Sequence, residues 1–190
     1  WHITDSMRGM TAFDGAGSTP AAELRANASD AEVNLSDFVL NATGFTVGPG
    51  NWNGSTAATY IYIAIRRGPM KVPTSGTSVF EPIARAGTSA IASVNTGIVT
   101  DAVWETGRSG QTNFAYDRLR GPLTEMSFTS TNSEANYTAA ATLTGFDSMT
   151  GFTVGADPSS FINGSGINYI NWAFRRSPGF FDEFCYSGTG

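Results

Sequence analysis

The side chains that most often do chemistry in proteins are scarce in this sequence. It holds one histidine, His2, and one cysteine, Cys185. A Ser-His-Asp triad, a histidine-based zinc site and a thiolate-rich metal site each need more of these residues than the chain has. We therefore expect no catalytic residue, no metal site and no cofactor.

Paired carboxylates are the remaining route to catalysis, as in a glycosidase. The candidate acids lie in loops where the two copies differ and follow no motif spacing, so we interpret them as surface acids. The candidates are Glu23, Asp30, Glu32, Asp37, Glu125, Glu134 and Asp147. An enzyme that cleaves polysaccharide, a depolymerase, is therefore the least favoured of three hypotheses. It predicts release of reducing sugar from a host polysaccharide.

An aspartate and an arginine recur at one spacing in both halves of the chain. Asp5 precedes Arg8 as Asp117 precedes Arg120, and a glycine follows each arginine. Such a pair most often fixes a turn, through an ion pair or through hydrogen bonds to the backbone. The alternative is a polar ligand contact, because the arginine fork fits carboxylates and sugar acids.

A tryptophan lies in a loop rich in glycine and asparagine, Gly-Pro-Gly-Asn-Trp-Asn at residues 48–53. A tryptophan between two asparagines could stack on a sugar ring, and the alternative is that it caps a hydrophobic patch. We assign Trp52, Asn53 and Asn163 as candidate ligand contacts, the last from the matching Asn-Gly-Ser motif.

Several sequence blocks occur twice and in the same order. Thr-Gly-Phe-Thr-Val-Gly stands at residues 43–48 and again at 150–155, and each copy is followed by a longer alternating stretch ending in Arg-Arg. Such self-similarity indicates two copies of one module. We predict copy one at residues 1–72, a connection at 73–100, and copy two at 101–190, in a chain that continues at both ends.

The composition and the alternation predict an all-β fold. Gly, Ser, Thr, Asn and aromatic residues are abundant, and only 14% of residues are charged, which suits short strands and many turns. The stretches 60–66 and 169–175 alternate with period two. We expect Ile170, Trp172 and Phe174 to face the core. Each copy is predicted to be a β-sandwich or jelly roll.

Charge and hydropathy exclude two classes of partner. The net charge is −5 and there is no dense basic cluster, so we expect no binding to nucleic acid. No apolar run is long enough to span a bilayer, so we expect no membrane insertion.

The motifs of the second half resemble a family. They include Trp-Glu-Thr-Gly-Arg-Ser-Gly at 104–110, Tyr-Asp-Arg-Leu-Arg-Gly at 116–121 and Ser-Pro-Gly-Phe-Phe-Asp at 177–182. With the repeated blocks, this pattern resembles the concanavalin A-like or related β-sandwich repeat of large tailed-phage virion proteins of the tail-fibre type. The resemblance implies a structural role, and the family offers no catalytic residues to carry over.

The preferred interpretation is a structural component of a phage virion, a repeated segment of a fibre, adhesin or surface-projecting protein. Its expected partners are copies of itself in a homo-oligomer, other virion proteins and host-surface glycan, and its expected location is the virion or the extracellular space. The alternative is a free carbohydrate-binding, lectin-like module of a secreted or cell-surface protein.

Overall fold

A computed structural model describes most of the chain. The described residues are 2–8, 10, 22–34, 38–41, 44–47, 59–65, 70–110, 113–137, 142–157 and 159–184. Trp52 and Asn53, two of the candidate ligand contacts, lie outside these ranges, as does Cys185. In the described part no helix is long and apolar enough to cross a membrane.

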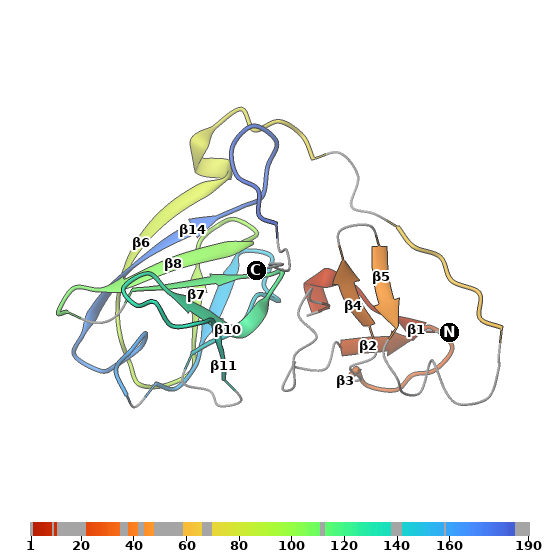
Figure 1. Ribbon diagram of the computed structural model, residues 1–190, viewed down its shortest axis with the longest axis horizontal. Coiled ribbons are helices and arrows are strands. Elements are labelled where there is room, and N and C mark those ends of the chain that lie inside the picture. Colours follow the sequence, from red (N-terminus) through yellow and green to blue (C-terminus); the bar gives the residue numbers. More distant parts are fainter. Residues whose placement is uncertain are drawn as a thin grey trace.

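Two sheets make up the C-terminal body (Figure 1). The larger has the order β11-β10-β9-β8-β14-β6, and the smaller has the order β12-β13-β7. The six strands of the larger sheet are β6 (Phe80–Ala86), β8 (Ala102–Gly107), β9 (Phe114–Asp117), β10 (Gly121–Ser127), β11 (Ala135–Asn136) and β14 (Asn168–Phe174). The smaller sheet holds β7 (Ala92–Asn95), β12 (Leu143–Gly145) and β13 (Gly151–Val154), and the short 3-10 helix η2 (Gly76–Ser78) precedes β6.

The core of this body lies between the two sheets. Its buried apolar side chains come from both: Val94, Val103, Phe114, Tyr116, Leu143, Phe146, Phe152, Val154 and Ile162. Apolar residues on the inner faces of two sheets, with strands of both supplying the cluster, make a β-sandwich. The all-β sandwich prediction is confirmed.

The face of β14 that points into the core is not the one predicted. Tyr169, Asn171 and Ala173 are buried, whereas Ile170, Trp172 and Phe174 are only half-buried. The prediction was wrong because the interior of the sandwich contains a polar network that recruits tyrosine and asparagine. The larger apolar side chains therefore lie on the opposite face of the sheet.

The stretch 73–100, predicted to be a connection, is part of the sandwich. It contains β6, which pairs with β14 along its whole length, and β7, which pairs with β13. The proline, glycine and serine residues that suggested a linker lie mainly before residue 77, ahead of these strands.

The N-terminal strands form two small sheets. One has the order β1-β2-β3 and the other pairs β4 with β5. The strands are β1 (His2–Ile3), β2 (Ala22–Arg25), β3 (Val33–Asn34), β4 (Phe38–Asn41) and β5 (Gly44–Val47), with a 3-10 helix η1 (Ser6–Arg8) after β1. The predicted strand at 60–66 is not formed where it is described, and two copies of one module stays a prediction.

Candidate functional site

A group of aromatic side chains covers the outer face of the six-stranded sheet. We call it the aromatic platform, and it consists of Phe80, Trp104, Phe128, Trp172, Phe174 and Phe181. Trp104 is 41% exposed although β8 is an inner strand of the sheet, and Phe128, directly after β10, is 50% exposed. A large exposed apolar patch on a soluble fold is a feature that calls for a binding role.

The strand register builds the platform. Trp104 of β8 lies directly opposite Trp172 of β14, and Phe174 lies opposite Phe80 of β6. Because side chains alternate along a strand, these residues share the face that points away from the small sheet. On its other side Trp172 lies opposite Pro82 of β6, which is exposed.

The rings hold one another in place. The centroids of Trp104 and Phe174 are 4.8 Å apart, and Phe174 stacks on Phe181 at 5.0 Å with an interplanar angle of 24°. Phe128 meets Trp104 edge to face at 5.6 Å. Contacts of this kind stabilise a fixed arrangement of rings, so the platform is organised before any ligand arrives.

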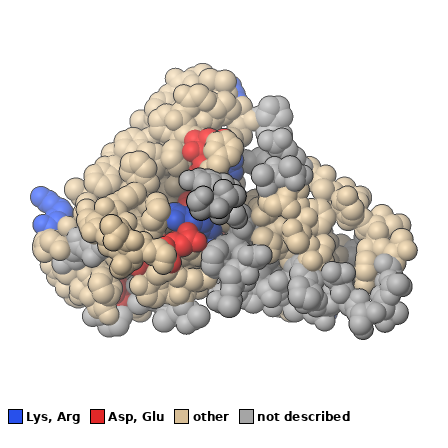
Figure 2. All heavy atoms as spheres, viewed as in Figure 1, with Lys and Arg blue, Asp and Glu red and all other residues tan. Residues whose placement is uncertain are grey.

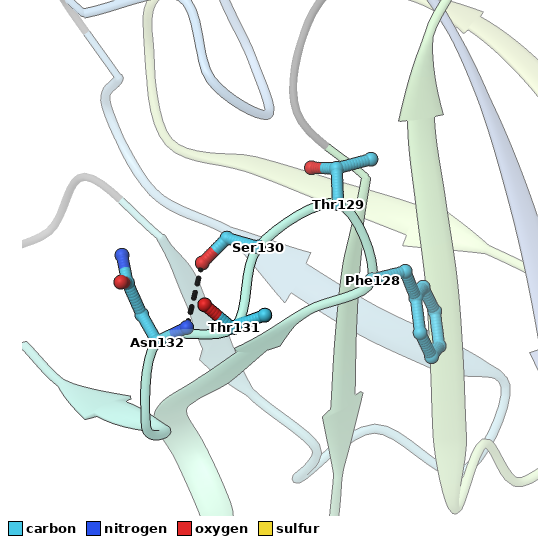
Figure 3. Close-up of a pocket in the computed structure, with 5 residues that line it drawn as sticks. All are labelled: Phe128, Thr129, Ser130, Thr131 and Asn132. Atoms are coloured by element: carbon cyan, nitrogen blue, oxygen red, sulfur yellow. Dashed lines mark hydrogen bonds between the residues drawn. The ribbon is translucent and has the colours of Figure 1, made fainter.

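A loop of small polar residues borders the platform. Residues 128–132 line a shallow hollow, and Phe128 turns from this loop toward the sheet (Figure 3). The hydroxyl of Ser130 accepts a hydrogen bond from the backbone N–H of Asn132 at 2.9 Å. The loop carries hydroxyl and amide groups but no charge. Charged side chains gather in a few patches on the molecular surface shown in Figure 2.

Inside the sandwich, Arg85 is the centre of a buried polar network. Its guanidinium donates to the side-chain oxygens of Asn171 at 2.8 Å, of Asn163 at 3.0 Å and of Glu105 at 2.5 Å, and also to the carbonyl of Ile162. The same guanidinium lies 4.9 Å above the ring of Tyr169. These contacts explain why the polar face of β14 is the buried one.

Asn163 belongs to this network and is not at the surface. It is completely buried, and its amide nitrogen donates to the carbonyls of Ala90 at 2.6 Å and of Gly155 at 2.9 Å. Its assignment as a ligand contact is therefore corrected: Asn163 links the segment before β7 to the segment after β13, and its amide is fully used within the protein.

The structure brings Asp117 and Arg120 together in a turn. Asp117 accepts a hydrogen bond from the backbone N–H of Arg120 at 2.7 Å and another from its side-chain Nε. In the N-terminal half, Asp5 accepts from the backbone N–H of Met7 at 2.9 Å, and the side chain of Arg8 lies outside the described residues. Both aspartates thus bond to the backbone two or three residues further on.

The described ranges contain no candidate metal-binding cluster. There, no three His, Cys, Asp or Glu side chains lie close enough together to hold a metal ion. The charged groups nearest the core are engaged in ion pairs, such as Arg118 with Asp101 at 3.0 Å. Among the described residues, the aromatic platform is an exposed apolar surface on which a ligand could pack.

Glu105 gives the sandwich a pH dependence that one substitution should change. Burial raises the pKa of Glu105 from 4.5 to about 8, against the opposing effect of Arg85. Between these values the folded state binds more protons than the unfolded chain, so the free energy of unfolding should fall as the pH rises from about 4.5 to about 8. We expect Glu105→Gln to reduce this fall.

Chemical denaturation at a series of pH values measures the effect. Burial raises the pKa of Glu183 to about 8 as well, so both proteins retain some pH dependence. The readout is therefore how much less the free energy of unfolding of Glu105→Gln falls with rising pH than that of the native protein. Parallel stability curves would show that Glu105 titrates alike in the folded and unfolded chains.

The exposure of the platform tryptophans was not predicted from the sequence. Trp104 was noted only within a motif, and Trp172 was assigned to the core. The available signal was in 168–174, where Ile170, Trp172 and Phe174 occupy one face of the strand and Tyr169 occupies the other. In a fold of two sheets a strand has one face in the core, so a strand with large side chains on both faces must expose some of them.

Comparison with known proteins gives one match. The family described as "Domain of unknown function (DUF7483)" matches residues 75–180, which is more than half of the chain and includes every strand of the sandwich. No curated protein and no solved structure matches the chain. The chain therefore belongs to the family of the domain of unknown function DUF7483.

Proposed function

We propose that this protein is a structural and adhesive component of a phage virion. In this proposal it forms a β-sandwich segment of a fibre or other surface-projecting protein, and its aromatic platform contacts host-surface glycan. The observation that carries the contact is the platform itself: ordered aromatic rings, centred on Trp104 and Trp172, on the outside of a sheet.

Glycan suits this surface for chemical reasons. Sugar rings present flat faces of C–H groups, which pack against aromatic rings, and hydroxyl edges, which bond to small polar groups. The platform supplies the rings, and the loop at 128–132 supplies uncharged hydroxyl and amide groups beside them. Such a mixture of an apolar surface with a few polar groups is typical of ligand sites.

The virion part of the proposal rests on the sequence. The motifs at 104–110, 116–121 and 177–182 resemble those of tail-fibre-type repeats, and a duplicated, sparsely charged β module suits a stiff rod. Copies of the chain and other virion proteins are the proposed partners. Electron microscopy of the native particle distinguishes this role from the alternative, a free lectin-like module: a beaded projection supports the virion role, and a compact soluble particle overturns it.

Trp104→Ala tests the platform. We expect the affinity for host-surface polysaccharide to fall at least about tenfold, because a central tryptophan often contributes 2 kcal/mol or more to a contact. Binding is measured on an immobilised glycan array and then by titration calorimetry with the best ligand.

Ile91→Ala is the matched control, since Ile91 is an exposed apolar residue, 67% accessible, that lies outside the platform. It should bind as the native protein does. If the native protein binds no glycan, or if Trp104→Ala binds as well as Ile91→Ala, the platform is not a glycan site.

A further inference from the structure

The N-terminal strands repeat the pairing order of part of the sandwich. β1, β2 and β3 pair in sequence as β9, β10 and β11 do, and β4 pairs with β5 as β12 pairs with β13. Each of these pairs is antiparallel. The N-terminal part therefore contains, in chain order, a counterpart for every strand from β9 to β13.

Sequence identities anchor this correspondence. β5 and β13 both read Gly-Phe-Thr-Val, and the Asp-x-x-Arg-Gly motif follows or ends the first strand of each series. The next alternating stretch, 59–65, corresponds to β14 through Tyr-Ile-x-x-Ala at residues 60–64 and 169–173.

The stretch 59–65 lacks the environment that β14 has. β14 lies between β6 and β8 in the larger sheet, whereas 59–65 pairs with no strand among the described residues. Ile61 and Ile63 are each 82% exposed and Ile65 is 89% exposed. Three β-branched apolar residues on one side of an extended segment are typical of a strand in a sheet, not of a free segment.

One ring contact joins this stretch to β5, although Tyr62 is 73% exposed. The ring of Tyr62 meets the ring of Phe45 in β5 edge to face, with centroids 5.3 Å apart. Tyr62 corresponds to Asn171 on the buried face of β14, and Phe45 corresponds to the core residue Phe152. The face that β14 turns toward the small sheet is thus the face that 59–65 turns toward β5.

A glycine supplies independent support. At Gly151 in β13 a Cβ atom would collide with the backbone carbonyl of Val94 in β7, so the close approach of β7 requires glycine. At the corresponding Gly44 in β5, the nearest atom to such a Cβ is the side-chain oxygen of Asn41 at 4.0 Å. Nothing in the described residues requires glycine at 44, but a neighbouring strand placed as β7 is would.

The neighbours that β1, β5 and 59–65 lack among the described residues correspond to strands of one continuous segment in the C-terminal sandwich. β8 lies beside β9, β7 lies beside β13, and β6 and β8 lie on either side of β14. We propose that the strands β1 to β5 and the stretch 59–65 form the receiving part of a second β-sandwich. Its occupant is a three-stranded β6-β7-β8 unit of the same kind as residues 75–110, carried by a further repeat of this family.

A second copy of this chain is not the proposed occupant, because its β6-β7-β8 unit is already engaged. β6 pairs with β14, β7 with β13, and β8 with both β14 and β9 of its own sandwich. A unit whose strands are still unpaired would bring backbone donors and acceptors that match those of β1, β5 and 59–65.

The experiment duplicates residues 75–110 ahead of residue 1 in the full chain, joined by a flexible Gly/Ser linker. Hydrogen–deuterium exchange of the amides of 44–47 and 59–65 is then compared with that of the native chain. We expect exchange to slow at least about hundredfold once these strands are enclosed in a sheet. Unchanged exchange in the extended chain would overturn the proposal.

Gly44→Ala tests whether the added protection comes from a strand that packs closely against β5 or from a general loss of flexibility. In the native chain the substitution should leave exchange unchanged, since a Cβ at this position has space. In the extended chain it should abolish most of the added protection. Protection of 59–65 that instead appears in the native chain as its concentration rises, with a doubled mass by light scattering, would identify a second copy as the occupant and overturn the proposal.

Discussion

Replacing Arg85 by alanine is expected to destabilise the sandwich by about 3–5 kcal/mol, because it removes the donor that three buried side chains share, and each buried acceptor left without a donor costs about 1–3 kcal/mol. The side chain of Arg85 is 12% exposed and that of Glu105 is completely buried. Without the guanidinium, the carboxyl of Glu105 and the side-chain oxygens of Asn163 and Asn171 lose a donor in a place that water does not reach.

Two comparisons make this result specific. Glu105→Gln keeps an acceptor for Arg85 and should cost much less, about 1 kcal/mol. Arg108→Ala removes an exposed arginine just after β8 and should change stability by no more than about 0.5 kcal/mol. Urea denaturation monitored by tryptophan fluorescence measures all three. Equal losses for Arg85→Ala and Arg108→Ala would show that the network contributes nothing to stability.

The same network shows why the sequence predicted the strands but not their orientation. Alternation in 169–175 identifies a strand, but it does not say which face is inside. Arg85 reaches Glu105, Asn163 and Asn171, which are 20, 78 and 86 residues away in the chain, and no local pattern reports such contacts. Without them, isoleucine, tryptophan and phenylalanine looked more suitable for the core than tyrosine and asparagine.

Short-range features were easier to predict. The Asp-x-x-Arg-Gly motif indicated a turn, and in the structure Asp117 bonds to the backbone and side chain of Arg120, three residues on. By contrast, the limits of the sandwich depend on β6 and β7, which have few large apolar residues and follow a stretch rich in proline and glycine. Their pairing with β14 and β13, distant in sequence, is what places them in the fold.

The candidate site illustrates the same limit. Trp52 was proposed as a possible sugar contact because it stands among glycines and asparagines, and it lies outside the described residues. The platform consists of residues whose positions are typical of a strand interior, such as Trp104 and Trp172. Whether a strand aromatic is core or surface depends on how many layers the fold has, and that is a property of the whole chain.

Phe152→Ala should destabilise the sandwich by about 3–5 kcal/mol, the usual cost of truncating a buried phenylalanine. Phe152 has no exposed surface and lies in the core cluster between the two sheets. The loss combines the transfer of the ring to water with the cavity that remains, since the surrounding side chains relax only in part. Thermal or urea unfolding of the full chain measures it.

Phe45→Ala is the matched control, because Phe45 stands at the same place in the repeated Gly-Phe-Thr-Val block. Phe45 is half-buried, and its described ring contacts are with Phe38 at 5.9 Å and Tyr62 at 5.3 Å. We expect its loss to leave the unfolding of the C-terminal sandwich unchanged. If the two substitutions cost the same, β5 is buried in the native chain as deeply as β13 is. The asymmetry between the two halves would then be smaller than the structure indicates.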